Sequence, residues 1–237
     1  GQLATWPHGK EIIALLRDAY KEGRSLQDAT FRFVHALFNE FGLLILLPDN
    51  AALKQTMLPV FRKELLEQPA SSILEQSAEA LTAAGYKVQA SAREINLFYL
   101  YEDIRNRIEF KNDSYQVVDT AIRFTRDEML AELEAHPERF SPNVILRGLY
   151  EETILPNIAF IGGGGETAYW LQLKGLFDFY NVPFPVLVLR NSFLLLEQKW
   201  NSVIAKTGYT IEDFFQPEEV LLNKLVIKES GEKVRLN

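Results

Sequence analysis

The stretch "NIAFIGGGGETAYWLQLKGLF", residues 157–177, decides the fold that we expect. The apolar run at residues 158–161 is typical of a buried strand, and the segment after the four glycines has the pattern of a helix whose first turn holds Glu166. Glycines permit positive φ angles and close approach of the backbone to a ligand. A helix N-terminus offers free N–H groups and a partial positive charge, which favour an anion. We therefore predict a ligand-binding turn at Gly163, Gly164 and Gly165.

Two other apolar runs extend this prediction to the whole fold. Residues 43–47 and 186–189 are apolar at every position, as in strands that are covered on both faces. Because such runs alternate with amphipathic helical segments, we predict an α/β fold, a Rossmann-like mainly parallel sheet with helices on both faces. Short alternating segments between residues 86 and 118 predict a small antiparallel β insertion. Ser25 with Asp28, and Thr125 with Glu128, have the spacing of N-terminal helix caps, and Ser141-Pro142 predicts another helix start. No linker-like stretch divides the chain, so we expect a single domain over residues 1–237.

Composition excludes several classes of function. The formal net charge of −7 argues against a nucleic-acid or anionic membrane surface. The absence of cysteine excludes disulfides, thiolate metal sites and cysteine nucleophiles, and the three histidines have no metal-ligand spacing. No apolar run approaches the roughly 18 residues of a membrane span. We therefore expect a cytoplasmic protein with no metal and no nucleic-acid or membrane partner.

Polar residues gather where the predicted strands end. In an open parallel sheet, ligands bind beyond the carboxyl ends of the strands. The glycine turn lies at such an end, polar residues follow the other two strands, and an arginine and a tyrosine lie one turn apart on the preceding helix. The candidate site residues outside the glycines are Asp49, Arg147, Tyr150, Glu166, Tyr169, Arg190 and Ser192.

Each candidate also has a structural interpretation. Glu166 suits a helix N-terminus, where a carboxylate stabilises by about 0.3–1 kcal/mol. Arg147 suits a solvated helix face, Tyr150 suits a core, and Asp49 suits a cap or turn. We interpret Glu166 as functional because so many polar residues accompany it at the same predicted edge.

Phosphate-binding motifs were the main alternative for the glycine turn. A P-loop needs Gly-Lys-Ser/Thr after the glycines, and Glu166-Thr167 stands there instead. The dinucleotide fingerprint fits Gly163, Gly165 and Ala168, and Arg190 stands where an NADP site would place a cation, but the Glu166 carboxylate would repel a pyrophosphate. An NADP-type oxidoreductase domain stays as one alternative, and a non-catalytic small-molecule binding or docking module as another.

Three stretches together resemble a known family. They are "INLFYLYEDIRNRIEF", "HPERFSPNVILRGLYEETILPNIAFIGGGGETAYWLQLK" and "VPFPVLVLRNSFLLLE". In order and spacing they are similar to the cysteine-adding enzymes of bacillithiol biosynthesis, with Gly148, Gly164 and Leu189 where that family has prolines. The family pattern falls on residues 137–140, Asn143, Arg147, Pro156, Gly163, Gly165, Glu166, residues 168–170, Arg190 and Ser192.

The resemblance implies a function as well as a Rossmann-like core. It implies a ligase that joins the carboxyl of cysteine to the amine of glucosaminyl malate by an amide bond, with ATP or ADP use left open. It also implies an N-terminal segment and a dimerising C-terminal coiled coil, neither of which we find here, so we expect a central fragment that is inactive alone. Glu166 would act as general base on the amine, and Asn143, Arg147 and Arg190 would contact substrate.

Overall fold

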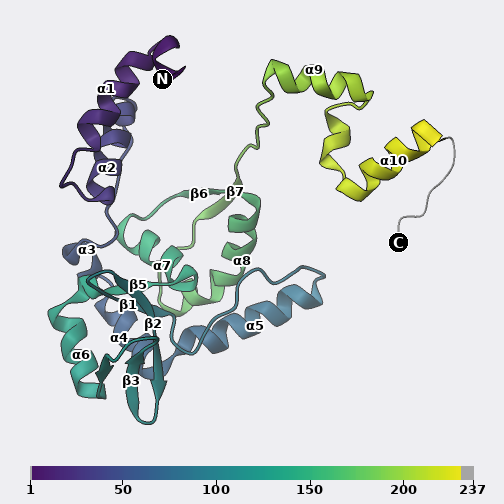
Figure 1. The fold of residues 1–237 in the computed structure, drawn as a ribbon. Coiled ribbons are helices and arrows are strands. Elements are labelled where there is room, and N and C mark those ends of the chain that lie inside the picture. The colour runs from purple at the N-terminus through teal and green to yellow at the C-terminus, as the bar shows by residue number, and fades with distance from the viewer. Residues whose placement is uncertain (1, 231–237) are drawn as a thin grey trace. The chain divides into compact units, whose positions relative to one another are not determined.

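The structure is a computed structural model that describes residues 2–230 (Figure 1). The chain forms two compact units, Gly1–Leu189 and Arg190–Asn237. No described residue of the second unit is buried, so the described part of this unit has no core of its own. Because a domain has its own core, this division does not test the expectation of one domain, which stays a prediction.

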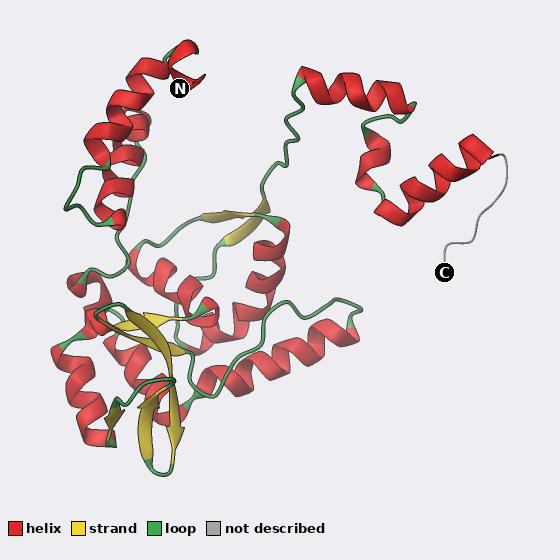
Figure 2. Cartoon of the chain, in the orientation of Figure 1, coloured by secondary structure: helices red, strands yellow, loops and turns green. Residues whose placement is uncertain are grey.

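The described part of the first unit begins with a run of helices, continues with a run of strands, and alternates between helix and strand only after residue 125, whereas the second unit is helical (Figure 2). The helices of the first unit are α1 (Gly9–Ala19), α2 (Leu26–Phe38), α3 (Ala51–Gln55), α4 (Leu58–Glu67), α5 (Pro69–Ala83), α6 (Arg126–Ala135), α7 (Val144–Ile154) and α8 (Gly164–Phe179). Its strands are β1 (Leu97–Tyr101), β2 (Ile104–Lys111), β3 (Ser114–Val117), β4 (Arg123–Phe124), β5 (Phe140–Pro142), β6 (Ala159–Gly162) and β7 (Val186–Leu189). Short 3-10 turns lie at Gln2–Thr5, Asn39–Phe41 and Pro137–Arg139.

The larger sheet is antiparallel, with the strand order β4-β3-β2-β1-β5. Phe98 of β1 faces Arg107 of β2 on one side and Ser141 of β5 on the other. The β2–β3 hairpin turns at Asn112 and Asp113, which both have positive φ, as a two-residue hairpin turn requires. The predicted antiparallel segment therefore exists, and it forms the main sheet of the unit together with β5.

The predicted mainly parallel sheet is wrong. Five strands are antiparallel, and the parallel sheet has two strands, β6 and β7, with Ala159 opposite Val186. Residues 43–47 form no strand and lie in a largely exposed loop. The expected parallel pairing of β6 with β7 is confirmed, but the side chains of Ile158, Ile161 and Leu189 are exposed rather than covered. An apolar run shows the preference for burial, and it does not show which partner covers it.

One hydrophobic core holds the sheet and the helices α4 to α8 together. It includes Phe61 of α4, Tyr99 of β1, Leu146 of α7 and Trp170 of α8, each at most 2% exposed. Phe160 of β6 stacks on Trp170 with ring centroids 4.0 Å apart. Buried aromatic and aliphatic side chains of this size each contribute about 1.5–3 kcal/mol, so this cluster fixes the positions of α7 and α8.

Helix α6, which follows β4, begins with a capping box, as the sequence predicts. Thr125 Oγ1 accepts a hydrogen bond from Glu128 N at 3.3 Å, and Glu128 Oε2 accepts one from Thr125 N at 2.7 Å. These backbone bonds hold the pKa of Glu128 below its usual range. The two bonds satisfy two N–H groups that would otherwise lack a partner at the start of α6.

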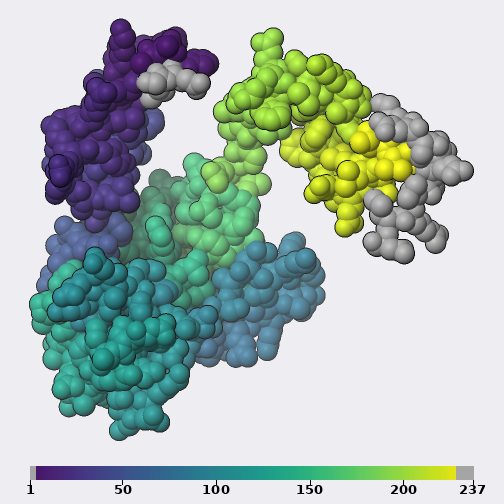
Figure 3. Space-filling model, in the orientation of Figure 1, coloured from purple at the N-terminus to yellow at the C-terminus, as the bar shows by residue number. Residues whose placement is uncertain are grey.

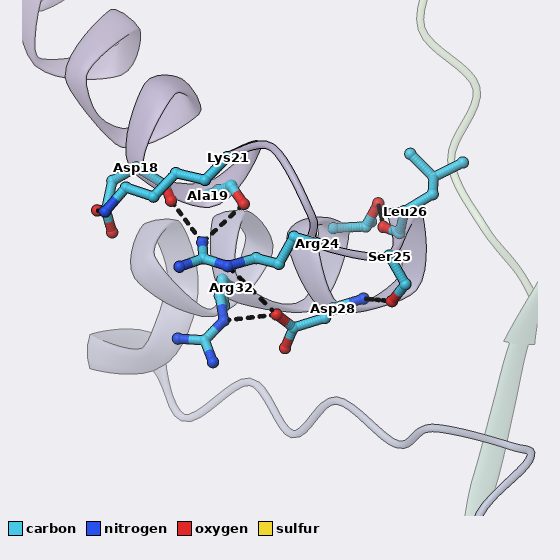
Figure 4. Close-up of polar contacts among 9 residues, drawn as sticks. Asp18, Ala19, Lys21, Arg24, Ser25, Leu26, Asp28 and Arg32 are labelled. Atoms are coloured by element: carbon cyan, nitrogen blue, oxygen red, sulfur yellow. Dashed lines mark hydrogen bonds and ion pairs between the residues drawn. The ribbon is translucent and has the colours of Figure 1, made fainter.

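The α1–α2 hairpin is closed by a polar cluster at its turn (Figure 4). Arg24 Nη1 donates to Ala19 O at 2.8 Å, and its Nε lies 3.5 Å from Asp28 Oδ2. Arg32 Nε donates to the same carboxylate oxygen at 2.9 Å. Ser25 Oγ accepts from Asp28 N at 3.1 Å, which confirms the predicted N-cap of α2.

The second unit, whose described residues are yellow-green to yellow in Figure 3, is held together by contacts within the unit. It contains α9 (Gln198–Thr207), a 3-10 turn (Glu212–Phe215) and α10 (Glu218–Ser230). Tyr209 donates to Leu221 O at 2.6 Å, and Lys224 Nζ lies 3.0 Å from Asp213 Oδ1. Among the described residues, no helix of either unit has the length and apolar character that a membrane crossing needs.

Candidate functional site

A cavity of about 720 Å³ lies against α7, α8 and the edge of the antiparallel sheet. Arg147 and Glu151 come to it from α7, and Glu166 and Tyr169 come from α8. The two helices contact each other, and the core residue Trp170 forms part of the cavity wall. The size suits a small-molecule ligand.

The glycine turn does not use the positive φ angles that glycine permits. All four glycines of the run are described, and none has a positive φ; Gly163 has φ −68° and precedes α8 as its N-cap. A Cβ on Gly162 would lie 2.5 Å from Phe160 Cε1, whereas a Cβ on Gly164 or Gly165 would meet nothing within 4 Å. The structure thus gives a steric reason for Gly162, and the ligand-binding role of the following three glycines stays a prediction.

Glu166 lies at the cavity wall and also closes the start of α8. Its Oε2 accepts a hydrogen bond from Gly163 N at 2.8 Å. A carboxylate in the first helical turn stabilises the partial positive charge there. The structural interpretation of Glu166 is therefore supported, and its side chain is at the same time exposed to the cavity.

Three arginines make the cavity electropositive. Arg93, Arg105 and Arg147 line it, and none of them lies within 4.0 Å of a carboxylate oxygen among the described ion pairs. Arg105 lies over the Phe98 ring at 4.0 Å and donates to Ser141 Oγ at 3.3 Å. Guanidinium groups without a carboxylate partner are ready to pair with an anionic ligand.

Two carboxylates, those of Glu151 and Glu166, line the same cavity. The surrounding protein atoms raise the pKa of Glu151, although solvent reaches its side chain, and the charges of Glu152 and Glu166 add to this rise. The positive charge of Arg147 opposes it. Burial likewise raises the pKa of Tyr169. A cationic group bound between Glu151 and Glu166 would relieve the repulsion of their like charges.

Asn143 is fixed at the cavity wall by its own helix. The sequence predicted a helix start at Ser141-Pro142, but these residues belong to β5, and Asn143 is the N-cap of α7. Its Oδ1 accepts from Ile145 N at 2.8 Å, and its Nδ2 donates to Asn96 Oδ1 at 2.8 Å. The predicted substrate contact of Asn143 therefore competes with a capping role that occupies its oxygen.

A buried carboxylate stands behind this wall. Glu64 is 0% exposed, and its Oε1 accepts from Asn96 Nδ2 at 2.7 Å and from Asn96 N at 3.0 Å. Asn96 in turn bonds the backbone N–H and C=O of Arg93 at 3.0 and 2.8 Å. Burial raises the pKa of Glu64, and the bonds from Asn96 oppose this rise. The network holds Arg93 and Asn143 in place beside the cavity.

A second cavity of about 300 Å³ adjoins the first. Asp49, Lys54 and Tyr150 line it, and Tyr150 donates to Pro48 O at 2.9 Å. Burial, with a contribution from Asp49, raises the pKa of Tyr150 to about 12. Lys54 is 1% exposed and donates to Asp49 Oδ1 at 3.0 Å, and burial lowers its pKa. Arg105 and Arg147 line both cavities, so the two form one continuous candidate site.

The structure brings together most of the predicted residues of the first unit. The larger cavity holds Asn143, Arg147, Glu166 and Tyr169, and the smaller one holds Asp49, Arg147 and Tyr150. Arg190 and Ser192 belong to the second unit, and both are exposed. Sequence reasoning missed four charged residues that line the cavities, because each stands in an ordinary amphipathic pattern without a motif. They are Lys54, Arg93, Arg105 and Glu151.

Comparison with known proteins gives the family. Residues 1–191 match the family described as "Bacillithiol biosynthesis BshC, N-terminal Rossmann-like domain". The chain belongs to the BshC family. The resemblance that the sequence motifs indicated is thereby confirmed, and the name of the family domain agrees with the Rossmann-like part of the expected fold.

Curated relatives of the BshC family align with nearly the whole chain. The chain is 41% identical over 230 residues to a Flavobacterium johnsoniae protein and 44% identical over 212 residues to a Flavobacterium psychrophilum protein, each named "Putative cysteine ligase BshC". These alignments cover 97% and 90% of this chain but 43% and 40% of the relatives. The chain therefore spans less than half the length of the curated relatives it matches.

Proposed function

We propose that the full-length protein is a ligase of bacillithiol biosynthesis, which joins the cysteine carboxyl to the amine of glucosaminyl malate. The observation that carries this proposal is the charge arrangement of the larger cavity. Arginines without an ion pair and two carboxylates, Glu151 and Glu166, line the same space, and its size suits a small molecule. The names of the curated relatives point to the same kind of reaction.

The substrate glucosaminyl malate has charges that match this cavity. Its malate part carries two carboxylates, for which Arg93 and Arg147 offer guanidinium groups. The substrate contact of Arg190 that the resemblance implies stays a prediction. Its amine is a cation near neutral pH and suits the space between Glu151 and Glu166. A dinucleotide would instead bring its pyrophosphate close to these carboxylates, so the charge arrangement favours the amino sugar over NADP.

Glu166 has the position for proton transfer from the amine. The ammonium must lose one proton before its nitrogen attacks the cysteine carboxyl. The attack forms the C–N bond, the nitrogen loses a second proton, and one carboxyl oxygen leaves either as water or, if ATP activates the carboxyl, with the phosphate or nucleotide that it carries. We propose that the Glu166 carboxylate takes the first proton as general base, which contributes about 10²–10⁴-fold to the rate in such reactions. Gly163 N holds the carboxylate by one oxygen at 2.8 Å, which orients it toward the cavity.

The test is turnover by the full-length enzyme with cysteine and glucosaminyl malate, with and without ATP, because activation of the carboxyl is part of the question. Glu166→Gln should lower kcat by about 10²-fold or more. The matched control is Glu128→Gln, which removes the same kind of helix-start carboxylate from α6, away from the cavity. A loss of a few-fold that is equal in both variants would return Glu166 to a purely structural role.

A melting-temperature panel separates the other functions. Ligands that bind the folded state raise the melting temperature by mass action. We expect malate-type dicarboxylates and amino sugars to stabilise the protein. A shift with NADP alone would favour an oxidoreductase, and no shift with any ligand would favour a docking module.

A further inference from the structure

We propose that the smaller cavity is the subsite for the amino-acid substrate, which it binds as a zwitterion with its carboxylate at Arg105 and its ammonium at Asp49. This inference deepens the proposed function and rests on it for the identity of the amino acid. It follows from the placement of one anion, Asp49, and three cations, Lys54, Arg105 and Arg147, around a cavity of about 300 Å³.

Asp49 is the part of the cavity that suits an ammonium group. Its Oδ1 accepts from Lys54, while its Oδ2 accepts no hydrogen bond from any described residue. Lys54 itself is not free for a ligand, because its three donors go to Asp49 Oδ1, to Glu138 O at 3.3 Å and to Phe140 O at 2.5 Å. The buried lysine thus anchors the carboxylate of Asp49, which remains partly exposed to the cavity.

Arg105 is the part that suits a carboxylate. Its guanidinium is held on the Phe98 ring, and its Nε and Nη2 lie 3.4 and 3.3 Å from Ser141 Oγ. Its Nη2 also donates to Pro142 O at 3.5 Å, whereas its Nη1 makes no hydrogen bond with any described residue. Arg105 makes no ion pair with the described carboxylates, so Nη1 is available to a ligand carboxylate. Arg147 lines the cavity as well, and it adds a second positive charge near the same place.

The geometry of the two cavities fits a reaction between two substrates. Arg105 and Arg147 line both cavities, so a carboxylate held by Arg105 lies where the smaller cavity joins the larger one. An amine bound near Glu166 in the larger cavity can approach it from that side. Tyr150 donates to Pro48 O and so fixes the backbone next to Asp49, which keeps the smaller cavity in shape.

Charge also excludes the dicarboxylate from the smaller cavity. A malate group would place its second carboxylate near Asp49, and like charges at this separation repel each other. An amino acid has one charge of each sign and avoids this cost. The cavity therefore discriminates between the two substrates by repulsion as well as attraction.

The test is calorimetry on the full-length protein with three ligands: cysteine, cysteamine, which lacks the carboxylate, and 3-mercaptopropionate, which lacks the amine. Arg105→Lys should weaken the binding of cysteine and of 3-mercaptopropionate by about tenfold or more, because lysine keeps the charge but loses the planar group that Phe98 and Ser141 hold in place. The binding of cysteamine should not change. Asp49→Asn should weaken the binding of cysteine and of cysteamine and leave the binding of 3-mercaptopropionate unchanged. The matched control is Arg123→Lys, an exposed arginine of the same sheet that donates only to nearby backbone carbonyls.

The outcomes separate this inference from the proposed function. Asp49→Asn removes the carboxylate that pairs with Lys54, and a melting curve will show whether this variant folds. If it does not fold, the result for Arg105→Lys alone decides whether the subsite exists. Equal losses of affinity for all three ligands, or displacement of cysteine by malate, would refute the amino-acid subsite. Neither result would contradict the proposed ligase function. Cysteine binding with the expected pattern of losses but no ligation by the full-length enzyme would overturn the ligase and leave an amino-acid site.

Discussion

Replacing Asn96 with alanine should be among the most destabilising single changes in the chain. Asn96 is fully buried, and its side chain makes four hydrogen bonds: one to the Glu64 carboxylate, two to the backbone of Arg93 and one from Asn143. A neutral hydrogen bond contributes about 0.5–1.5 kcal/mol and one to a charged group about 1.5–3 kcal/mol. We therefore expect the free energy of unfolding to fall by about 3–7 kcal/mol, which approaches the whole stability of many domains.

The size of this loss should depend on pH, because Glu64 loses a donor. Burial already raises the pKa of Glu64 in the folded state, and removal of the Asn96 amide raises it further. A raised folded-state pKa means that the folded protein binds the proton more tightly than the unfolded chain. Stability then falls as pH rises from the unfolded value of about 4.3 through the folded pKa. The cost of Asn96→Ala should be smaller at pH 5 than at pH 7.5.

Urea unfolding followed by tryptophan fluorescence measures this effect, since Trp170 lies in the core. Asn96→Ala and the wild type are compared at both pH values. The control adds Glu64→Gln to each, which removes the titrating group and should make the cost of Asn96→Ala independent of pH. A loss below about 1 kcal/mol, or the same loss at both pH values in the presence of Glu64, would refute the assignment of this network.

Three further changes test separate parts of the structure. Gly148→Ala places a Cβ 3.0 Å from Trp170 Cζ2 and should lower stability by about 1–3 kcal/mol in thermal melts; an unchanged melting temperature would mean that the ring moves freely. Thr125→Ala removes the cap of α6 and should cost about 0.5–2 kcal/mol, which Thr125→Ser should restore. Arg190→Lys should weaken glucosaminyl-malate binding by about 1.5–3 kcal/mol in calorimetry and leave glucosamine unaffected; equal losses for both ligands would indicate a structural role.

Local features of the fold were predictable from the sequence, and the make-up of the main sheet was not. The caps at Ser25 and Thr125 and the parallel pairing of β6 with β7 follow from short patterns, and the structure confirms them. The antiparallel strands form the main sheet together with β5, which pairs with β1 across about 40 residues, and no local pattern encodes that pairing. Residues 43–47 are as apolar as a strand, yet they lie in a loop without a pairing partner among the described residues.

The site was predictable only where residues stand in a motif or at the end of a predicted element. Glu166, Arg147 and Tyr150 were found in this way, and the structure places them around two joined cavities. Arg105 lies in the middle of a sheet and Lys54 in a short helix, where charged residues are usually solvated. Arg105 and Lys54 can be recognised as cavity residues only after folding has brought the edge of the sheet next to α7. No short window of the sequence contains that information.

The open edges of β6 and β7 have a consequence for handling the chain in solution. Each strand pairs on one side only within the described part of the chain, and their neighbourhood exposes Ile158, Ile161, Val186 and Leu189. Unpaired strand edges bordered by aliphatic side chains are templates for strand addition from another molecule. We therefore expect this pair of strands to determine the tendency of the protein to aggregate more than the net charge of −7 does. Aggregation should increase with protein concentration.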